Sequence, residues 1–253
     1  MNRSTSSSAA MQSASRTARA NLKLLLFLAA AVLATIVPAI AQMGGGLQDK
    51  IAILKESLRE NQLRLHQYQW METTQLTLKG DPKPPKSSLC QYGPDGTVQK
   101  EPIGPPPPPP SGGRLKQRII EKKKEEMQEY MGQVKNLLSM YVPPNPLKME
   151  QAFQAGNVSL NPNPGAQETA IVFRNYAQPG DQMTVSFNTA VKKVTTVQVN
   201  TYMDDPKDTV TLMIQMASLP DGTNYVQQSI LNATAKQLQV TTTNSNYQRL
   251  GGQ

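Results

Sequence analysis

Residues 182–188 have the sequence Gln-Met-Thr-Val-Ser-Phe-Asn, and residues 209–218 have the sequence Thr-Val-Thr-Leu-Met-Ile-Gln-Met-Ala-Ser. Apolar residues occupy alternate positions in both stretches: Met183, Val185 and Phe187 in the first, and Val210, Leu212, Ile214 and Met216 in the second. Successive side chains of a β-strand point to opposite faces. Both stretches therefore predict strands with one apolar face, which another element must cover.

The sequence around these stretches, from residue 158 onward, is rich in Val, Thr, Gln and Asn and predicts further strands. Candidate strands cover residues 169–176, 194–202, 224–233 and 238–245. Gly, Pro and Asp mark the turns near residues 178–181, 204–206 and 219–222. Such short connections join antiparallel neighbours, because parallel strands need long crossovers. We therefore expect an antiparallel meander.

Three segments have the apolar periodicity of amphipathic helices. Residues 47–68, 114–141 and 147–155 repeat apolar side chains at intervals of three or four. In the second segment a run of lysines at 122–124 is followed at once by two glutamates, which is typical of a solvated helix surface. Peripheral membrane contact through Arg114, Lys116, Arg118 and the lysines at 122–124 is the alternative. We expect two or three of the helices to cover the apolar face of the sheet.

A strand and a hairpin are predicted between the first two helices. Residues 70–78 are rich in Thr and alternate at their end, which favours a strand. The turn sequence Gly93-Pro94-Asp95-Gly96 predicts a hairpin between residues 88–92 and 97–100. A Pro-rich loop follows at residues 102–113, in which residues 105–110 are an unbroken run of prolines. This run favours a stiff polyproline spacer, with a docking site for a proline-binding domain as the alternative.

The first 41 residues have the features of a secretory signal peptide. They contain four basic and no acidic residues, an apolar run from residue 24 to residue 37, and small residues up to Ala41. The run is shorter than the roughly 20 residues of a membrane span, so cleavage near Ala41 is favoured over an uncleaved anchor. The rest of the chain, residues 42–253, is then expected to be periplasmic or secreted.

Charge and composition exclude several classes of function. The chain has 26 Lys and Arg residues against 18 Asp and Glu, a net charge of +8, and removing the signal segment lowers this to +4. Nucleic-acid binding loses its main support, because it needs a clustered basic face. Cys90 and His66 are the single Cys and the single His, too few for a disulfide framework or a Cys/His zinc site.

Few residues could carry catalysis or bind a metal. His66 has no acidic partner fixed by its spacing, so we expect no enzyme, with a hydrolase that uses His66 as a minor alternative. Asp204, Asp205 and Asp208 lack the alternate spacing and the glycine of a calcium loop, so they favour a charged turn. Cys90 is expected to be buried or simply tolerated. We predict no catalytic residue, no metal and no cofactor.

Methionine is frequent, with 12 residues in the chain. Its flexible side chain adapts to irregular surfaces and to varied ligands. Two interpretations stay open: the methionines fill a loosely shaped core, or they line a cavity for an apolar guest. A curved sheet with helices on one face can keep such a cavity.

The order of these elements resembles a known family. A long helix that leads into a Tyr68-Gln69-Trp70 strand, a Tyr-Gly-Pro-Asp-Gly hairpin at 92–96, central helices and a final meander are similar to the periplasmic lipoprotein-carrier (LolA-like) half-barrel. The resemblance covers most of residues 47–249 and implies an incomplete antiparallel barrel closed by helices over an apolar cavity. It supplies no functional residue that matches a position here. The sequence around residues 70–79, 122–130 and 218–225 also resembles uncharacterised secreted bacterial proteins.

We therefore predict a single α+β domain over residues 42–253, with an antiparallel half-barrel covered by two or three helices. The leading hypothesis is non-catalytic binding of a lipid, lipoprotein or other apolar molecule in the cell envelope. The predicted ligand-binding residues are Trp70, Met131, Val185, Phe187, Leu212, Ile214 and Met216. The alternative is a structural or interaction protein with a fully packed sheet. The sequence predicts no nucleic-acid partner and leaves the oligomeric state open.

Overall fold

The computed structural model describes residues 46–104, 114–162 and 167–251. The chain forms two compact units, Met1–Asp49 and Lys50–Gln253. In the first unit, residues 46–49 are described and are helical. The second unit contains the sheet and the helices that lie on it. The predicted signal segment (residues 1–41) and the proline run (residues 105–110) lie outside the described residues.

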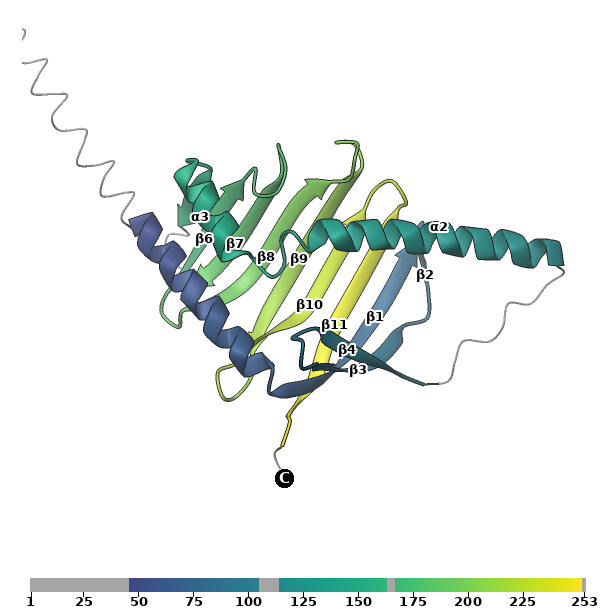
Figure 1. The fold of residues 1–253 in the computed structure, drawn as a ribbon, viewed down its shortest axis with the longest axis horizontal. Helices are drawn as coiled ribbons and strands as arrows, with labels where there is room; N and C mark the ends of the chain where they lie inside the picture. The colour runs from purple at the N-terminus through teal and green to yellow at the C-terminus, as the bar shows by residue number, and fades with distance from the viewer. Residues whose placement is uncertain (1–45, 105–113, 163–166, 252–253) are drawn as a thin grey trace, which may run out of the picture. The chain divides into compact units, whose positions relative to one another are not determined.

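One antiparallel sheet of eleven strands dominates the second unit (Figure 1). Its strands are β1 (Tyr68–Leu78), β2 (Asp81–Pro82), β3 (Lys86–Tyr92), β4 (Val98–Ile103), β5 (Val158–Pro162), β6 (Glu168–Arg174), β7 (Gln182–Asn188), β8 (Lys193–Tyr202), β9 (Thr209–Ser218), β10 (Asn224–Ala233) and β11 (Leu238–Arg249). Their order is β4-β3-β1-β11-β10-β9-β8-β7-β6-β5, and β2 pairs with β1. The sheet is curved and does not close, because β4 and β5 are its two edges.

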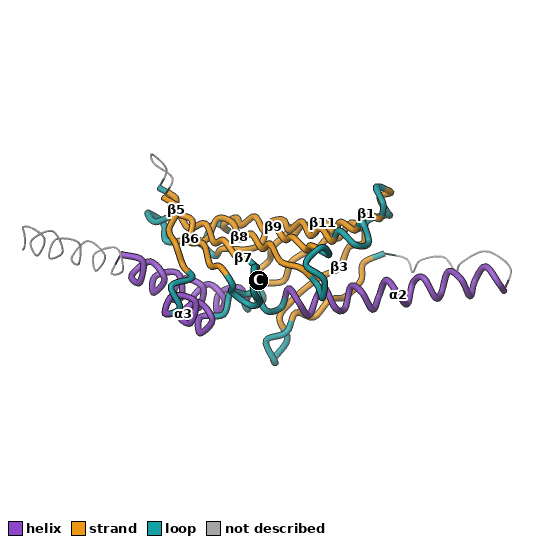
Figure 2. The backbone as a smooth tube through the Cα atoms, turned by 90° about the horizontal axis from the view of Figure 1, so that it is seen from above, coloured by secondary structure: helices purple, strands orange, loops and turns teal. Residues whose placement is uncertain are grey.

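Three helices lie on one side of this sheet (Figure 2). The N-terminal helix covers residues 46–65, of which residues 50–65 belong to the second unit. The others are α2 (Arg114–Leu138) and α3 (Pro146–Gln154). We call the side that they cover the helix face and the opposite side the outer face. Among the described residues, no helix has the length and hydrophobicity that a membrane span requires.

The predicted fold class is confirmed. The meander and the helix-covered half-barrel are present, and strands β7, β9 and β10 have the predicted bounds. Three differences follow from strand pairing. The first strand pairs with the last, which extends β11 to Arg249. β5 is an added edge strand on β6. β4 continues to Ile103, so Pro102 lies in a strand and not in the predicted Pro-rich loop.

The closed part of the core lies between the N-terminal helix, α3, the end of α2 and strands β6–β8. The helices contribute Ile51, Leu54, Val134, Leu137, Met149 and Ala152, which are all at least nine-tenths buried. The strands contribute Ile171, Phe173, Met183, Val185, Phe187, Val197 and Val199, none more than 4% exposed. The burial of these closely packed apolar side chains is the main source of stability for such a domain.

A buried carboxylate fixes the chain at the end of this core. Asp181 is 2% exposed and accepts hydrogen bonds from the backbone N–H groups of Tyr176, Ala177 and Gln178 at 2.6–2.9 Å. It also accepts one from the Tyr141 hydroxyl at 2.5 Å. Burial and this contact raise the pKa of Tyr141 well above its ordinary value. Four donors thus satisfy one carboxylate and connect the segment after α2 to the turn before β7.

The middle of α2 is fixed above the turns of the meander. The Tyr130 hydroxyl donates to Asp208 Oδ1 at 3.2 Å, and Lys236 Nζ lies 5.6 Å from the centre of the Tyr130 ring. Burial, with Asp208 nearby, raises the pKa of Tyr130 to about 12. Both views show the helix crossing these turns and continuing past β1 (Figures 1 and 2). The predicted charged turn at 204–208 therefore serves to position α2.

The N-terminal helix is joined to β10 by one side chain. The Asn61 amide accepts from Asn224 N at 2.6 Å and donates to Asn224 O at 2.7 Å. The Asn224 side chain in turn donates to Val194 O at 2.7 Å. One asparagine thus satisfies both backbone groups of a buried residue at the start of a strand.

Replacing Asn61 by Leu is expected to lower the free energy of unfolding by about 2 kcal/mol, because both buried backbone groups of Asn224 lose their partner. Urea unfolding followed by circular dichroism would measure this loss. The exposed neighbour Gln62, changed to Leu, is the control and is expected to stay within about 0.5 kcal/mol. Equal losses in the two variants would show that the Asn61 contact does not hold the helix.

Candidate functional site

Cross-strand pairing arranges the helix face in rows. One apolar row takes one residue from each of seven neighbouring strands, in the sheet order β1, β11, β10, β9, β8, β7 and β6. Its members are Leu76, Val240, Leu231, Leu212, Val199, Met183 and Phe173. The next row consists of Thr74, Thr242, Ser229, Ile214, Val197, Val185 and Ile171. The second row thus changes from hydroxylated residues on β1, β11 and β10 to apolar residues on the other strands.

Burial changes along the same rows. Their members on β6–β8 are at most 4% exposed, whereas Leu76, Leu212 and Val240 are only half-buried. Met216 and Val226, which pair across β9 and β10, are half-buried as well. We call these five residues the open strip. Apolar side chains on the covered side of a sheet are normally buried, so the open strip is helix-face surface that the described helices cover only in part.

A row of aromatic rings lies at one end of the open strip. His66 stacks on Tyr92 with ring centroids 4.3 Å apart, and Tyr92 lies 5.4 Å from Trp70. The Trp70 ring stacks on Tyr247 at 5.6 Å and 10°, and Tyr247 lies 4.4 Å from Tyr225. We call these five rings the aromatic row. Its members come from the end of the N-terminal helix and from strands β3, β1, β11 and β10. The row therefore brings side chains from five segments of the chain into contact.

Polar groups without partners accompany the aromatic row. The buried side-chain atoms that lack a hydrogen bond within the described residues include Trp70 Nε1, Asn244 Oδ1 and His66 Nε2. Asn244 lies directly across from Glu72, whose carboxylate pairs with Lys100 Nζ at 2.5 Å. A buried unpaired polar group costs about 1–3 kcal/mol. The end of the strip therefore combines apolar rings with unused hydrogen-bonding capacity.

A hydrogen bond from Tyr68, at the edge of the aromatic row, lowers the pKa of Asp221. Tyr68 is buried, and its hydroxyl donates to Asp221 Oδ2 at 2.6 Å, while Thr223 N donates to Asp221 Oδ1 at 2.8 Å. These bonds, that from Tyr68 first, lower the pKa of the Asp221 carboxyl from its ordinary 3.8 to about 2. Because the folded carboxyl holds its proton less tightly, folding is favoured while Asp221 is ionised.

Replacing Tyr68 by Phe is expected to destabilise the protein above about pH 4, with a difference from the wild type that shrinks as the pH falls towards 2. Asp221 is exposed, so the effect at neutral pH should stay below about 1 kcal/mol. Thermal unfolding of both proteins over this pH range would measure it. A difference that grows on acidification would contradict the contact.

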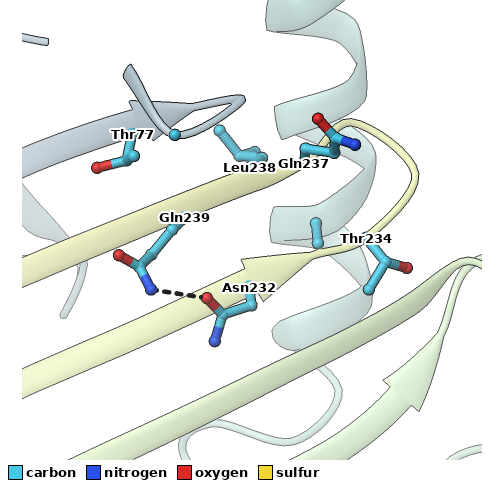
Figure 3. Close-up of a pocket in the computed structure, with 8 residues that line it drawn as sticks. Thr77, Asn232, Thr234, Gln237, Leu238 and Gln239 are labelled. Atoms are coloured by element: carbon cyan, nitrogen blue, oxygen red, sulfur yellow. Dashed lines mark hydrogen bonds between the residues drawn. The ribbon is translucent and has the colours of Figure 1, made fainter. Parts of the chain in front are cut away.

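The outer face carries a shallow hollow of about 440 Å³ beside the turn between β10 and β11 (Figure 3). Its lining includes Thr77, Asn232 and Gln239, which register places on the outer face. The Gln239 amide donates to Asn232 Oδ1 at 2.9 Å. The hollow has no charged lining residue and lies on the side of the sheet opposite to the open strip.

The predicted ligand-binding residues all belong to the helix side of the sheet, but in two environments. Val185 and Phe187 are buried on β7 within the closed core. On β9, Ile214 is buried, whereas Leu212 and Met216 belong to the open strip. Trp70 is in the aromatic row, and Met131 is half-buried on α2, next to Tyr130. Whether any of them contacts a ligand stays a prediction.

The other two residues singled out from the sequence, His66 and Cys90, lie in or beside the aromatic row. The ring of His66 is in the aromatic row. Cys90 is fully buried beside Trp70 on the neighbouring strand, and this burial raises the pKa of its thiol. Within the described ranges, no group of three or more His, Cys, Asp or Glu side chains is placed to hold a metal ion.

Sequence reasoning missed Tyr225, Tyr247 and Asn244. The predicted last strand ended at residue 245, before Tyr247, although its polar alternation continues beyond that point. Asn246 has a positive φ of 54°, and two residues of β11 stand opposite Trp70 alone. This β-bulge brings the Tyr247 ring to the side of Trp70. The sequence signal that could have indicated this cluster is the presence of Tyr and Trp residues near the start of the domain, at 68 and 70, and near its end, at 225 and 247.

Comparisons with known proteins show no family for this chain. No family model matches the sequence, and no curated protein matches it. Among solved structures, a DUF1329 family protein from Desulfovibrio piger ATCC 29098 is similar with a TM-score of 0.39 and 8% identity. The similarity covers 80% of this chain and 93% of that chain. This neighbour comes from an uncharacterised bacterial family, and its name makes no reference to lipoprotein carriers.

Proposed function

We propose that this protein is exported to the cell envelope and binds the apolar chain of a lipid or lipoprotein on its open strip, without catalysing a reaction. One observation carries the proposal: a single apolar row is at most 4% exposed on β6–β8, but its members on β9, β11 and β1 are only half-buried, on either side of the buried Leu231 of β10. A partly covered apolar surface between a curved sheet and helices is a common place for an apolar ligand. The element order that resembles lipoprotein carriers supports the same proposal.

The side chains around the open strip suit an amphiphilic guest. Thr74, Thr242 and Ser229 form a small, hydroxylated row beside the apolar one. Small side chains leave room, and their hydroxyls can satisfy a polar group of the guest. The nearby ion pair of Glu72 with Lys100 carries no net charge.

Native mass spectrometry of the protein, purified from a bacterial envelope without detergent, tests this proposal. We expect a bound mass that organic solvent removes as lipid, together with a chain mass that starts near residue 42. An apo mass, unchanged after incubation with monoacyl lipids, would contradict the binding proposal. That outcome would favour the alternative of an envelope interaction protein.

A further inference from the structure

The aromatic row and the neighbouring Asn244 supply a hydrogen-bond donor and an acceptor that no other described residue uses. Trp70 is 6% exposed, and its Nε1–H has no partner within the described residues. The Asn244 side chain donates through Nδ2 to Val226 O at 2.9 Å, but its buried Oδ1 accepts no hydrogen bond from any residue that the structure describes. An indole N–H can only donate and an amide oxygen can only accept. The pair therefore matches a group that both accepts and donates.

Register places these two groups close together on the helix face. Asn244 is the direct partner of Glu72, and Trp70 precedes Glu72 by two residues on the same strand and the same face. Diagonal neighbours of this kind have α-carbons roughly 7–8 Å apart. A hydroxyl or amide group of a ligand between the two side chains could therefore reach both.

The charge around this position selects against ionic head groups. The Glu72 carboxylate is paired with Lys100 at 2.5 Å, and the Glu72 side chain is only 15% exposed. The paired charges leave no net charge to attract a phosphate, a carboxylate or an ammonium group. Taking an ionic group out of water into such surroundings carries a large desolvation cost.

The rings of Tyr92 and Tyr247 pack against Trp70. Tyr225 and Tyr247 are half-buried, and no hydrogen bond joins either hydroxyl to another described residue. Their rings can therefore change rotamer without breaking a hydrogen bond. From Trp70 in the aromatic row, the helix face continues along β1 through Glu72 and Thr74 to Leu76 and Leu78, a path of roughly 26 Å at the usual rise of a strand.

We propose that the aromatic row is the head-group end of the site: the ligand is an amphiphile with an uncharged, hydroxyl- or amide-bearing head that bonds to Trp70 Nε1 and Asn244 Oδ1. Its chain lies along the open strip towards α2. This inference rests on the proposed function and adds to it the class of ligand and the direction in which the ligand lies.

Two probes with the same acyl chain test the inference: glycerol monolaurate, with a neutral hydroxylated head, and laurate, with an anionic head. Binding to the full domain is measured by calorimetry below the micellar concentration. We expect glycerol monolaurate to bind at least about tenfold more tightly, which corresponds to about 1.4 kcal/mol. Asn244→Leu should reduce this ratio to about twofold while leaving the affinity for laurate unchanged.

Thr243→Val is the matched control, because Thr243 is the exposed neighbour on the outer face of the same strand. It should keep the full ratio. Trp70→Phe is a second variant, which removes the donor together with part of the ring, and it should also reduce the ratio. Equal affinities of the wild type for both probes, or a ratio unchanged in Asn244→Leu and Trp70→Phe, would overturn the head-group assignment alone. Binding of neither probe would overturn the proposed function as well.

Discussion

Replacing Asp181 by Asn is expected to lower the free energy of unfolding by about 3 kcal/mol, the largest stability effect of a single polar change that we predict. Three backbone N–H groups and the Tyr141 hydroxyl donate to this buried carboxylate. An asparagine keeps the volume but presents an NH₂ group to donors on one side. At least one buried donor then loses its acceptor and faces another donor. Thermal unfolding should show a midpoint lower by roughly 6–12 °C.

The control for this prediction is Asp204→Asn, because Asp204 is exposed in a neighbouring turn. It is expected to change stability by less than about 0.5 kcal/mol. Tyr141→Phe removes one of the four donors and should fall between the two variants. A loss below about 1 kcal/mol in Asp181→Asn would mean that the turn before β7 can rearrange without cost.

Replacing Val240 by Asp is expected to weaken binding of a monoacyl lipid about 100-fold, equivalent to about 2.8 kcal/mol. Val240 is half-buried in the middle of the open strip, between Leu76 and Leu231 in the same row. A carboxylate there would have to lose water when an acyl chain covers it. Because the position is half-exposed in the free protein, the same carboxylate stays hydrated without ligand. Folding should therefore suffer much less than binding, and calorimetric titration measures the difference.

The adjacent residue Thr241 supplies a closely matched control. It lies on the same strand with the same half-buried exposure, but its side chain points to the outer face. Thr241→Asp adds the same charge and should leave the affinity within about twofold. Val240→Thr, nearly equal in volume, is expected to weaken binding by about tenfold. If both aspartate variants weaken binding equally, the ligand does not lie on the helix face.

Local patterns were sufficient to predict most elements of this fold. Alternation in residues 182–188 and 209–218 predicted β7 and β9 and the face that each buries. A Gly-Pro-Asp-Gly turn predicted the hairpin of β3 and β4. These signals come from neighbouring residues, for which the period of the side chains decides the structure.

The candidate site depends on contacts that no local pattern contains. Pairing of β1 with β11 joins residues far apart in the sequence, such as Leu76 with Val240 and Trp70 with Tyr247. Alternation placed Leu212, Ile214 and Met216 correctly on one face, but it could not separate the buried Ile214 from the half-exposed neighbours. That difference depends on where the helices end above the sheet, which is a property of tertiary packing.

Quenching of the single tryptophan tests the central claim most directly. Trp70 is the only Trp of the chain and lies in the aromatic row, so its fluorescence reports on one end of the open strip. We predict that a monoacylglycerol brominated on the chain carbons next to its head group quenches this emission saturably, that the bromine-free parent restores it, and that Val240→Asp abolishes the effect. Saturable binding of the brominated lipid by calorimetry without any quenching of Trp70 would contradict the account.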